Sequence, residues 1–278
     1  MAESLFSRAA SLISQSDSLI ITAGAGIGVD SGLPDFRGPK GFWGVYPALG
    51  KAKMHFEDIA CPTAFIENPR LAWGFYGHRL AMYREVEPGP AFRILLEIAK
   101  RLTYGAFVYT SNVDGHFQKA GFDPRRIVEC HGSIHHLQCL NECMQDIWAA
   151  QTFNPEVDTD ACQLLNDFPT CKWCGGIARP NIVLFGDYSW LNGRAVPQRH
   201  RYGEWKLQVE RPIVIEIGAG TSIPTVRFFS ENQHCPLIRI NLTEAEVSRP
   251  DDISLPIGGT AGMQGIAAAL LELGFMER

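Results

Sequence analysis

The sequence predicts an α/β protein built on a doubly wound, parallel, Rossmann-like sheet with a smaller domain inserted into it. Three observations lead to this prediction. Short runs rich in Ile, Val and Leu recur along the chain, helical patterns lie between or after them, and the first run breaks into glycines. Nearly continuous apolar runs suit strands that helices cover on both faces, and their alternation with helices favours parallel order.

The individual elements follow from the periodicity of the apolar residues. The segments with a helical pattern are 5–13, 71–84, 91–102 and 262–273. The expected strands are 18–22, 106–110, 126–130, 181–185, 212–217 and 237–241.

Two stretches interrupt this alternation. Residues 38–85 are rich in Gly, Pro and aromatics, and residues 132–180 carry clustered cysteines. We therefore assign both to the smaller domain, as a helical module and a zinc-binding module. The Rossmann-like domain then consists of residues 1–37, 86–131 and 181–278.

Composition excludes several classes of protein. With 46% apolar and 20% charged residues, the chain has an ordinary globular composition. Its net charge of -5 and the absence of long Lys or Arg runs give no reason to expect nucleic-acid binding. The N-terminus lacks a secretory pattern, and no run approaches the roughly 20 apolar residues that span a bilayer. We expect no membrane contact and a cytoplasmic location.

Four cysteines indicate a metal site. Cys139 and Cys143 form one close pair, and Cys171 and Cys174 form a second, followed by two glycines. Two spaced pairs supply four thiolates to one tetrahedral zinc, and such a closed site is structural. Unrelated buried or redox-active cysteines are the alternative, and Cys162 is a rival ligand. Because a closed site leaves no open position on the metal, the chemistry must come from elsewhere.

The segment from Thr22 to Arg37 is the first candidate for that chemistry. A strand that breaks into glycines and then a helix lets backbone N–H groups approach a pyrophosphate, which the positive end of the helix stabilises. The segment departs from the standard dinucleotide pattern, because Val29 stands where the third glycine belongs. A tight structural turn is the alternative.

Several motifs in order then resemble those of the sirtuin family, the NAD-dependent protein lysine deacylases, of bacterial type. The resemblance extends from about residue 20 to residue 262. The motifs that carry it are 24–26, 32–37, 110–115, 129–133, 174–176, 179–187, 220–222 and 240–242.

The resemblance implies roles for particular residues. His131 is expected to be the base that activates a ribose hydroxyl of NAD, because histidine titrates near neutral pH, and Asn112 is expected to orient the cofactor. An acylated lysine of a peptide is expected to enter between the domains and to pair with 183–186 and the backbone near Ile223. The expected cofactor-binding residues are Ala23, Gly24, Ala25, Gly26, Asp35, Phe36, Arg37, Ser111, Asn112, Asp114, Gly220, Thr221, Ser222, Asn241 and Ala261. The expected peptide-binding residues are Val183, Leu184, Phe185 and Gly186.

Some positions depart from the family pattern. Asp30, Ser111 and Asp187 replace the residues usual there, and they resemble a macrodomain-linked branch associated with protein ADP-ribosylation. That branch typically lacks the catalytic histidine, so His131 favours deacylation. Two alternatives remain open: a protein mono-ADP-ribosyltransferase that uses the same NAD site, and a non-catalytic, NAD-sensing scaffold.

Tyr76 and Arg79 suggest the class of acyl group. Positions i and i+3 share a helix face, so both side chains can point into one pocket and bind a carboxylate. The same spacing resembles that of sirtuins that remove succinyl, malonyl or glutaryl groups. A surface arginine beside a packed tyrosine is the alternative, and the neighbouring Tyr83 and Arg84 weaken the signal.

Overall fold

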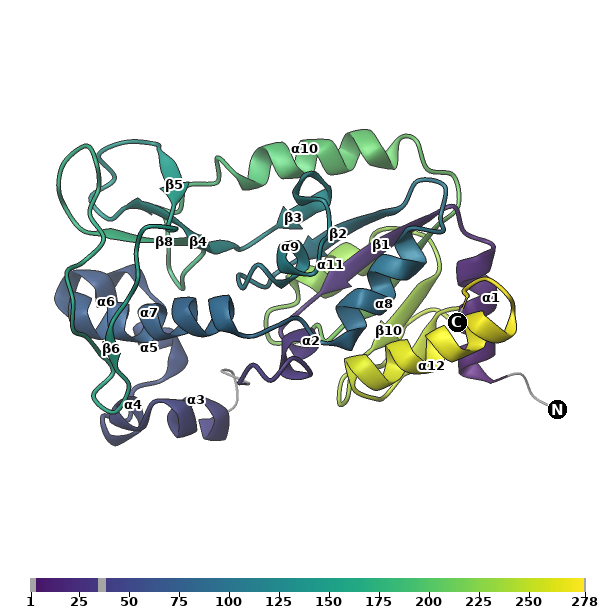
Figure 1. Cartoon of the computed structure of the whole chain (residues 1–278), viewed down its shortest axis with the longest axis horizontal. Helices are drawn as coiled ribbons and strands as arrows, with labels where there is room; N and C mark the ends of the chain where they lie inside the picture. The colour runs from purple at the N-terminus through teal and green to yellow at the C-terminus, as the bar shows by residue number, and fades with distance from the viewer. Residues whose placement is uncertain (1–3, 35–38, 278) are drawn as a thin grey trace.

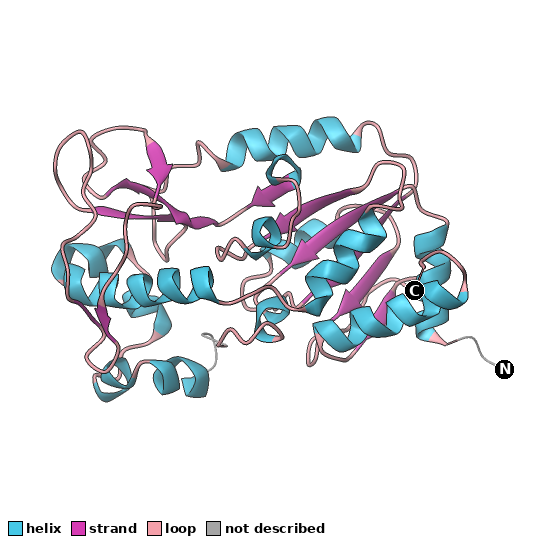
Figure 2. Ribbon diagram, viewed as in Figure 1, coloured by secondary structure: helices cyan, strands magenta, loops and turns pink. Residues whose placement is uncertain are grey.

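A six-stranded parallel sheet organises the larger part of the molecule (Figures 1 and 2). The computed structural model describes residues 4–34 and 39–277. The strand order is β11-β10-β9-β1-β2-β3, and all the neighbouring pairs are parallel. This order confirms the predicted Rossmann-like sheet. The strands are β1 Ser18–Ala23, β2 Ala106–Thr110, β3 Ile127–Glu129, β9 Pro212–Ile217, β10 Leu237–Ile240 and β11 Ile253–Leu255.

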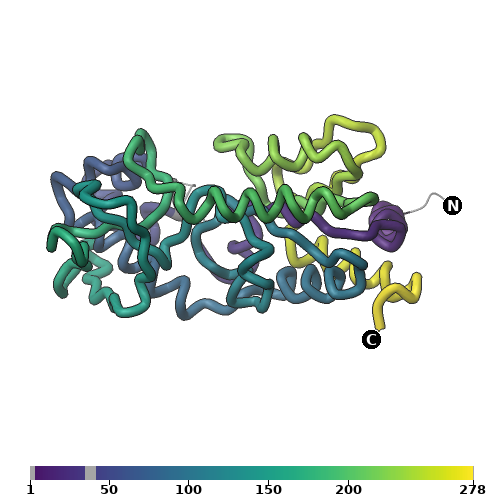
Figure 3. Tube along the Cα trace, turned by 90° about the horizontal axis from the view of Figure 1, so that it is seen from above, coloured from purple at the N-terminus to yellow at the C-terminus, as the bar shows by residue number. Residues whose placement is uncertain are grey.

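Helices cover both faces of this sheet (Figure 3). Leu19 and Ile21 of β1 pack toward α1 Leu5–Ser14, α8 Pro90–Ala99 and α12 Gly259–Glu272. The intervening Ile20 packs in the opposite layer, with residues of α10 Ala195–Lys206 and α11 Thr225–Glu231. Because successive side chains of a strand point to opposite faces, a largely apolar run such as β1 suits burial on both sides.

One predicted strand was wrong. Residues 181–185 do not form a strand of the parallel sheet; β8 Ala178–Ile182 pairs antiparallel with β4 Gly132–Cys139, which also pairs with β5 Ile147–Ala149. The apolar residues after Ile182 line a cavity instead of continuing a strand, and a short apolar run does not distinguish these two environments. The sixth parallel strand is the three-residue β11, too short to give a periodic signal.

A second apolar core lies beside the sheet. It contains Phe65, Trp73 and Phe75 from the helical stretch and Ile134 and Leu164 from the cysteine-bearing stretch. The assignment of these stretches to a separate domain stays a prediction; β8 crosses its predicted boundary at residue 181. The helices of this region are α3 Pro39–Val45, α4 Pro47–Lys51, α5 Phe56–Ile59, α6 Pro62–Glu67 and α7 Pro69–Glu85. Its remaining strands are β6 Val157–Asp158 and β7 Gln163–Leu164.

Helix α7 is the element that connects this core to the cavity described below. It starts at Pro69, whose ring suits the first helical position, and the Asn68 side chain caps it by accepting a hydrogen bond from Leu71 N at 3.2 Å. Three short helical elements complete the fold: α2 Gly26–Val29, α9 His116–Lys119 and the 3₁₀ turn η1 Pro124–Arg126. None of the helices in the described part of the chain has the length and apolarity to cross a bilayer.

Candidate active site

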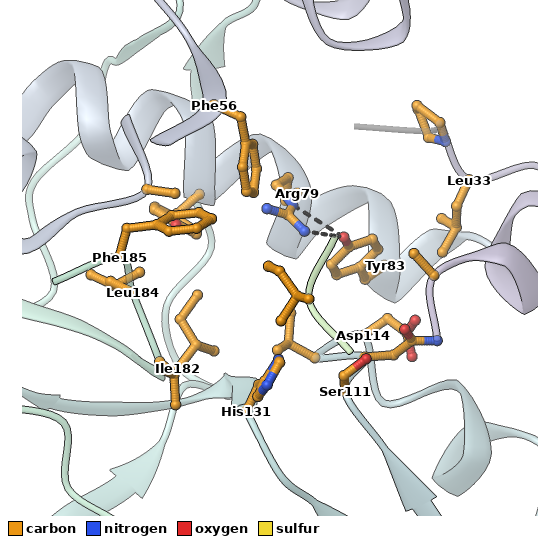
Figure 4. A pocket seen from close by; sticks show the side chains of 18 of the residues that line it. Leu33, Phe56, Arg79, Tyr83, Ser111, Asp114, His131, Ile182, Leu184 and Phe185 are labelled. Carbon is orange, nitrogen blue, oxygen red and sulfur yellow. Dashed lines mark hydrogen bonds between the residues drawn. The ribbon is translucent and has the colours of Figure 1, made fainter. Parts of the chain in front are cut away.

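A cavity of about 400 Å³ opens at the carboxyl ends of β1 and β2, next to the second core (Figure 4). The strand order reverses between β1 and β9, and ligands of doubly wound sheets bind at such a point. The lining combines expected cofactor residues with expected substrate residues. The described residues that line it are Ala25, Leu33, Pro34, Phe56, Ala60, Tyr76, Arg79, Tyr83, Ser111, Asn112, Val113, Asp114, His131, Ile182, Val183, Leu184, Phe185, Gly186 and Ile223.

Three glycines form a backbone crossing at the floor of this region. A Cβ built on Gly218 would lie 2.4 Å from Gly26 Cα, and one on Gly24 would lie 2.6 Å from Gly218 O. The N–H groups of Gly24 and Gly26 donate to Ile217 O and Gly218 O, both at 3.0 Å. Contrary to our expectation, the backbone N–H groups of Gly24 and Gly26 are not directed at a pyrophosphate, because both are bonded to the loop after β9. The glycines allow two loops to touch, and Ala25 between them lines the cavity.

Asn112 is tied to this crossing. Its Nδ2 donates to Gly24 O at 3.0 Å, and its backbone N–H donates to Thr110 Oγ1 at 3.0 Å. Ser111 N donates to Ala23 O at 3.1 Å, which continues the pairing of β2 with β1. The amide side chain thus has a fixed orientation at the edge of the cavity, as a residue that positions a ligand requires.

Asp114 contacts the start of α9 and also lies at the cavity. Its Oδ1 accepts from His116 N at 2.8 Å, which caps α9, and the residue also lines the cavity. Burial raises the pKa of this carboxyl, against the opposing influence of His116. His135 Nε2 lies 2.7 Å from Asp114 O and holds the turn in place.

His131 lies in the cavity wall, on the side facing Arg79 and Phe56 in Figure 4. Its carbonyl accepts from Val183 N at 2.9 Å, so the expected base and the expected peptide-binding segment are directly joined. The next residue must be glycine, because Gly132 has a φ of +82° and an added Cβ would lie 2.1 Å from Asn181 O.

Glu129 holds the strand that leads to His131 in place, a role that we did not predict from the sequence. The carboxylate is buried and accepts from Arg194 Nη2 at 2.6 Å and from Gln198 Nε2 at 3.2 Å. It thereby anchors β3, two residues before His131, to the start of α10. A glutamate in an apolar strand was the available signal, since a buried carboxylate needs partners.

Tyr76 and Arg79 both line the cavity, as their spacing predicted. The Arg79 Nε and Nη2 atoms donate to Tyr83 Oη at 3.1 and 2.7 Å. Tyr83 had counted against the site in the sequence, yet it is a direct partner of the arginine. By contrast, the Tyr76 hydroxyl has no hydrogen-bond partner among the described residues, and burial raises its pKa.

The segment after β8 forms the wall opposite α7. Phe185 N donates to Ala60 O at 2.8 Å, and the Phe185 ring meets the Phe56 ring edge-on at a centroid distance of 5.9 Å. Asp187 ends this segment in a buried ion pair with Arg179, at 2.8 Å. The four residues 183–186 are therefore held at both ends and line the cavity together.

The remaining expected cofactor residues lie elsewhere. Thr221 N donates to Glu244 Oε2 at 3.0 Å, Thr221 Oγ1 donates to the same carboxylate, and Asn241 Nδ2 donates to Ala219 O at 3.0 Å. Both side chains thus stabilise loops after β9 and β10. Ala261 is exposed in the first turn of α12. None of these lines the cavity, and neither do Ala23, Gly220 and Ser222. Asp35, Phe36 and Arg37 lie outside the described residues.

Other lining residues had no role assigned to them from the sequence. Leu33, Phe56, Ala60, Val113 and Ile182 are apolar residues that any core would contain, and only the approach of the two cores brings them to the cavity. Val113 and Ile223 come from loops that follow strands of the sheet.

The four predicted zinc ligands come together. Their Sγ atoms all lie within 4.8 Å of one another, with Cys139 and Cys174 at 3.6 Å and Cys143 and Cys171 at 3.5 Å. Tetrahedral zinc with bonds of about 2.3 Å places its sulfurs roughly 3.8 Å apart, so the donor set fits a closed, structural zinc site. Cys162 is not a member of this cluster; it is buried against α7.

The comparisons with known proteins agree with this geometry. Residues 24–216 match the Sir2 family. An NAD-dependent protein deacylase from Aquifex aeolicus is 27% identical over 257 residues, covering 91% of this chain and 95% of the relative. One from Pyrococcus furiosus is 31% identical over 207 residues, covering 74% and 73% of the two chains.

Solved structures show the same fold. A mutant Sir2 homologue in complex with ADP-ribose matches with a TM-score of 0.72 and 22% identity, over 100% of both chains. A Sir2 homologue in complex with NAD also gives a TM-score of 0.72 at 22% identity, over 96% of this chain and 94% of its own. The matched residues confirm the resemblance to the sirtuins, and the chain belongs to the Sir2 family.

Proposed function

We propose that this chain is an NAD-dependent protein deacylase, which transfers an acyl group from a lysine side chain to ADP-ribose, consumes one water and releases nicotinamide and the free lysine amine. Membership of the Sir2 family and the names of the relatives support this activity. One observation carries the proposal: a single cavity joins Asn112, Asp114 and His131 to the peptide-binding segment 183–186.

NAD, as the co-substrate, supplies the ribose carbon that receives the acyl oxygen once nicotinamide leaves. Asn112 and Asp114 orient the ribose and the nicotinamide amide, and both are held by backbone hydrogen bonds. His131 accepts the proton of the ribose hydroxyl. Apolar side chains such as Val113 and Ile182 shield the ribose carbon from bulk water until the acyl oxygen has bonded to it.

The zinc has no part in this chemistry. Cys139, Cys143, Cys171 and Cys174 would hold it with all four positions taken, so it supplies folding free energy to the second core. We also propose a cytoplasmic location, because cysteines serve metals instead of disulfides mostly in reducing compartments.

The acyl group is proposed to end in a carboxylate. Arg79 is only 9% exposed, and its guanidinium carbon lies 5.2 Å from the Phe75 ring centroid and 5.9 Å from that of Tyr76. A buried guanidinium beside a phenol that has no hydrogen-bond partner among the described residues binds a carboxylate more strongly than the methyl of an acetyl group. Succinyl-, malonyl- or glutaryl-lysine has this property.

A product assay tests the activity. The protein is incubated with NAD and a panel of acylated peptides, and mass spectrometry follows nicotinamide, acylated ADP-ribose and modified protein. The His131→Ala variant should lose about 10²-fold to 10⁴-fold in rate and keep NAD binding. Transfer of ADP-ribose to protein that survives in this variant favours the transferase alternative. Absence of every product in the parent favours the scaffold.

A second assay tests the acyl class. Succinyl-lysine peptides should show a lower KM than acetyl-lysine peptides of the same sequence, and Arg79→Met should reverse this preference. If the parent has the same KM for both peptides, the proposed acyl class is wrong, and Tyr76 and Arg79 have only a structural role.

A further inference from the structure

The contact between Arg79 and Tyr83 fixes how one edge of the guanidinium and the phenol oxygen are used. Nε and Nη2 lie on one edge of the guanidinium, and both donate to the same phenol oxygen (Figure 4). A guanidinium has no acceptor, so the phenol oxygen must accept both bonds. The edge of Arg79 that carries Nε is therefore occupied by Tyr83.

The phenol proton is left for another partner. A phenol oxygen has one O–H and two acceptor positions, and the two bonds from Arg79 use the acceptor positions. The O–H must point away from the guanidinium, and Tyr83 lines the same cavity as Arg79. Burial raises the pKa of Tyr83 against the opposing influence of Arg79, so the proton is retained at neutral pH.

We infer that Tyr83 is a specificity-determining residue of the acyl pocket: it fixes the orientation of Arg79 and donates its own hydroxyl proton to the terminal carboxylate of a dicarboxylic acyl-lysine. This inference rests on the proposed function and adds a third contact to those of Tyr76 and Arg79. Tyr83 is a neutral partner, so it orients the guanidinium without cancelling its positive charge.

A purely structural role of the Tyr83 ring can be distinguished from the proposed role of its hydroxyl. Tyr83 is 5% exposed, and its ring lies 6.4 Å from the buried ring of His116, centroid to centroid. Tyr83→Phe keeps these ring contacts and removes only the hydroxyl. Tyr83→Met, whose flexible side chain fills part of the same space, removes both the hydroxyl and the ring and serves as a second variant.

The experiment measures steady-state kinetics on a succinyl-lysine and an acetyl-lysine peptide of identical sequence. In Tyr83→Phe, the ratio of kcat/KM for the succinyl peptide to that for the acetyl peptide should fall about 10-fold to 100-fold, since a hydrogen bond to a charged group is lost. The change should come from a higher KM for the succinyl peptide. Tyr83→Met should lower the ratio in the same direction.

Tyr202→Phe is the matched control. Its hydroxyl donates to Gln233 Oε1 on the face of the parallel sheet that α10 and α11 cover, and neither residue lines the cavity. Loss of this hydroxyl should therefore leave the ratio unchanged. The inference is overturned if both peptides lose activity equally in Tyr83→Phe, if the ratio does not move, or if the two Tyr83 variants disagree.

The outcomes also separate this inference from the proposed acyl class. A parent enzyme that does not prefer the succinyl peptide overturns the carboxylate pocket and Tyr83's role with it. A parent that prefers it, with Arg79→Met abolishing the preference and Tyr83→Phe leaving it intact, overturns the role of Tyr83 alone.

Discussion

The two walls of the cavity are built in different ways. Behind the cofactor wall, which Ala25, Ser111, Asn112 and Asp114 line, the loops after β1 and β9 touch backbone to backbone. An added Cβ at Gly24 or Gly218 would lie within 2.6 Å of the other loop. On the acyl wall, side chains of α7 make the surface, with Tyr76, Arg79 and Tyr83 facing one space. The first wall accepts almost no change, whereas the second can be altered by substituting one side chain.

This difference has a physical basis. Backbone atoms in contact leave no room for relaxation, because interiors are packed as densely as organic crystals. Around Arg79, by contrast, the rings of Phe56, Phe75 and Tyr83 lie 5.2–6.0 Å from the guanidinium carbon, and ring packing tolerates changes in polar groups at the ring edge. Selectivity for the acyl group can therefore change while the site for NAD stays the same.

The largest expected effect comes from loss of the zinc, because the second core, which includes the acyl wall on α7, depends on it for folding. Cys171→Ser, or a chelator, should unfold much of the second core and abolish activity, because the binding free energy of a four-cysteine zinc site is folding free energy. Hydrogen exchange should show the loss of protection there and its retention in the parallel sheet.

Elemental analysis should find one zinc per chain in protein purified without chelator. Cys61→Ser is the control, since Cys61 is not in the cluster and its Sγ donates to Asp58 O, a bond that serine can keep. A protein without zinc, or with these four cysteines in disulfides, contradicts the prediction.

The next effect tests the cofactor wall. Gly218→Ala should cost about 2–5 kcal/mol of unfolding free energy, from overpacking against Gly26 and from the positive φ of 63°. Urea unfolding and NAD binding measure it. Gly203→Ala is the control: a Cβ there meets nothing within 4 Å in α10, so stability should rise by about 0.4–1 kcal/mol. Equal stability of both variants would refute the backbone crossing.

A smaller loss of stability is expected when the link between α12 and the loop after α2 is removed. Asp30 Oδ2 accepts from Thr260 N at 2.6 Å and so caps the first turn of that helix. Asp30→Ala should cost about 1 kcal/mol, and Asp30→Asn, which keeps an acceptor, should cost less. The succinyl-to-acetyl ratio of kcat/KM should stay at the parent value in both. A changed ratio would show that the two walls are coupled.

The smallest effect concerns pH. Burial raises the pKa of Asp114 in the folded state, so its ionisation destabilises the folded protein once pH rises above the unfolded value of 3.8. Asp114→Asn keeps the acceptor for His116 N and should melt at a higher temperature than the parent at pH 7. The difference should shrink as pH falls through the raised pKa, where both side chains are neutral. A difference independent of pH would contradict this assignment.

Much of the fold could be predicted from the sequence because its signals are local. Ala106–Thr110 and Pro212–Ile217 form strands with the predicted bounds, since short runs that are mostly apolar and β-branched or aromatic have few alternatives. The prediction failed at 181–185, where apolar residues line a cavity, and at Ile253–Leu255, where three residues give no periodicity.

By itself, the sequence determined the parallel sheet, the cysteine cluster and the presence of Tyr76 and Arg79 on one face of a helix, since periodicity and spacing act within a few residues. Tertiary structure decided which groups meet across long separations. It joined Gly26 to Gly218, Val183 to the carbonyl of His131, and the second core to the end of the sheet. It also decided that Tyr83 accepts both bonds from Arg79, because a spacing fixes the face of a helix but not the side-chain rotamer or the partner that packing selects.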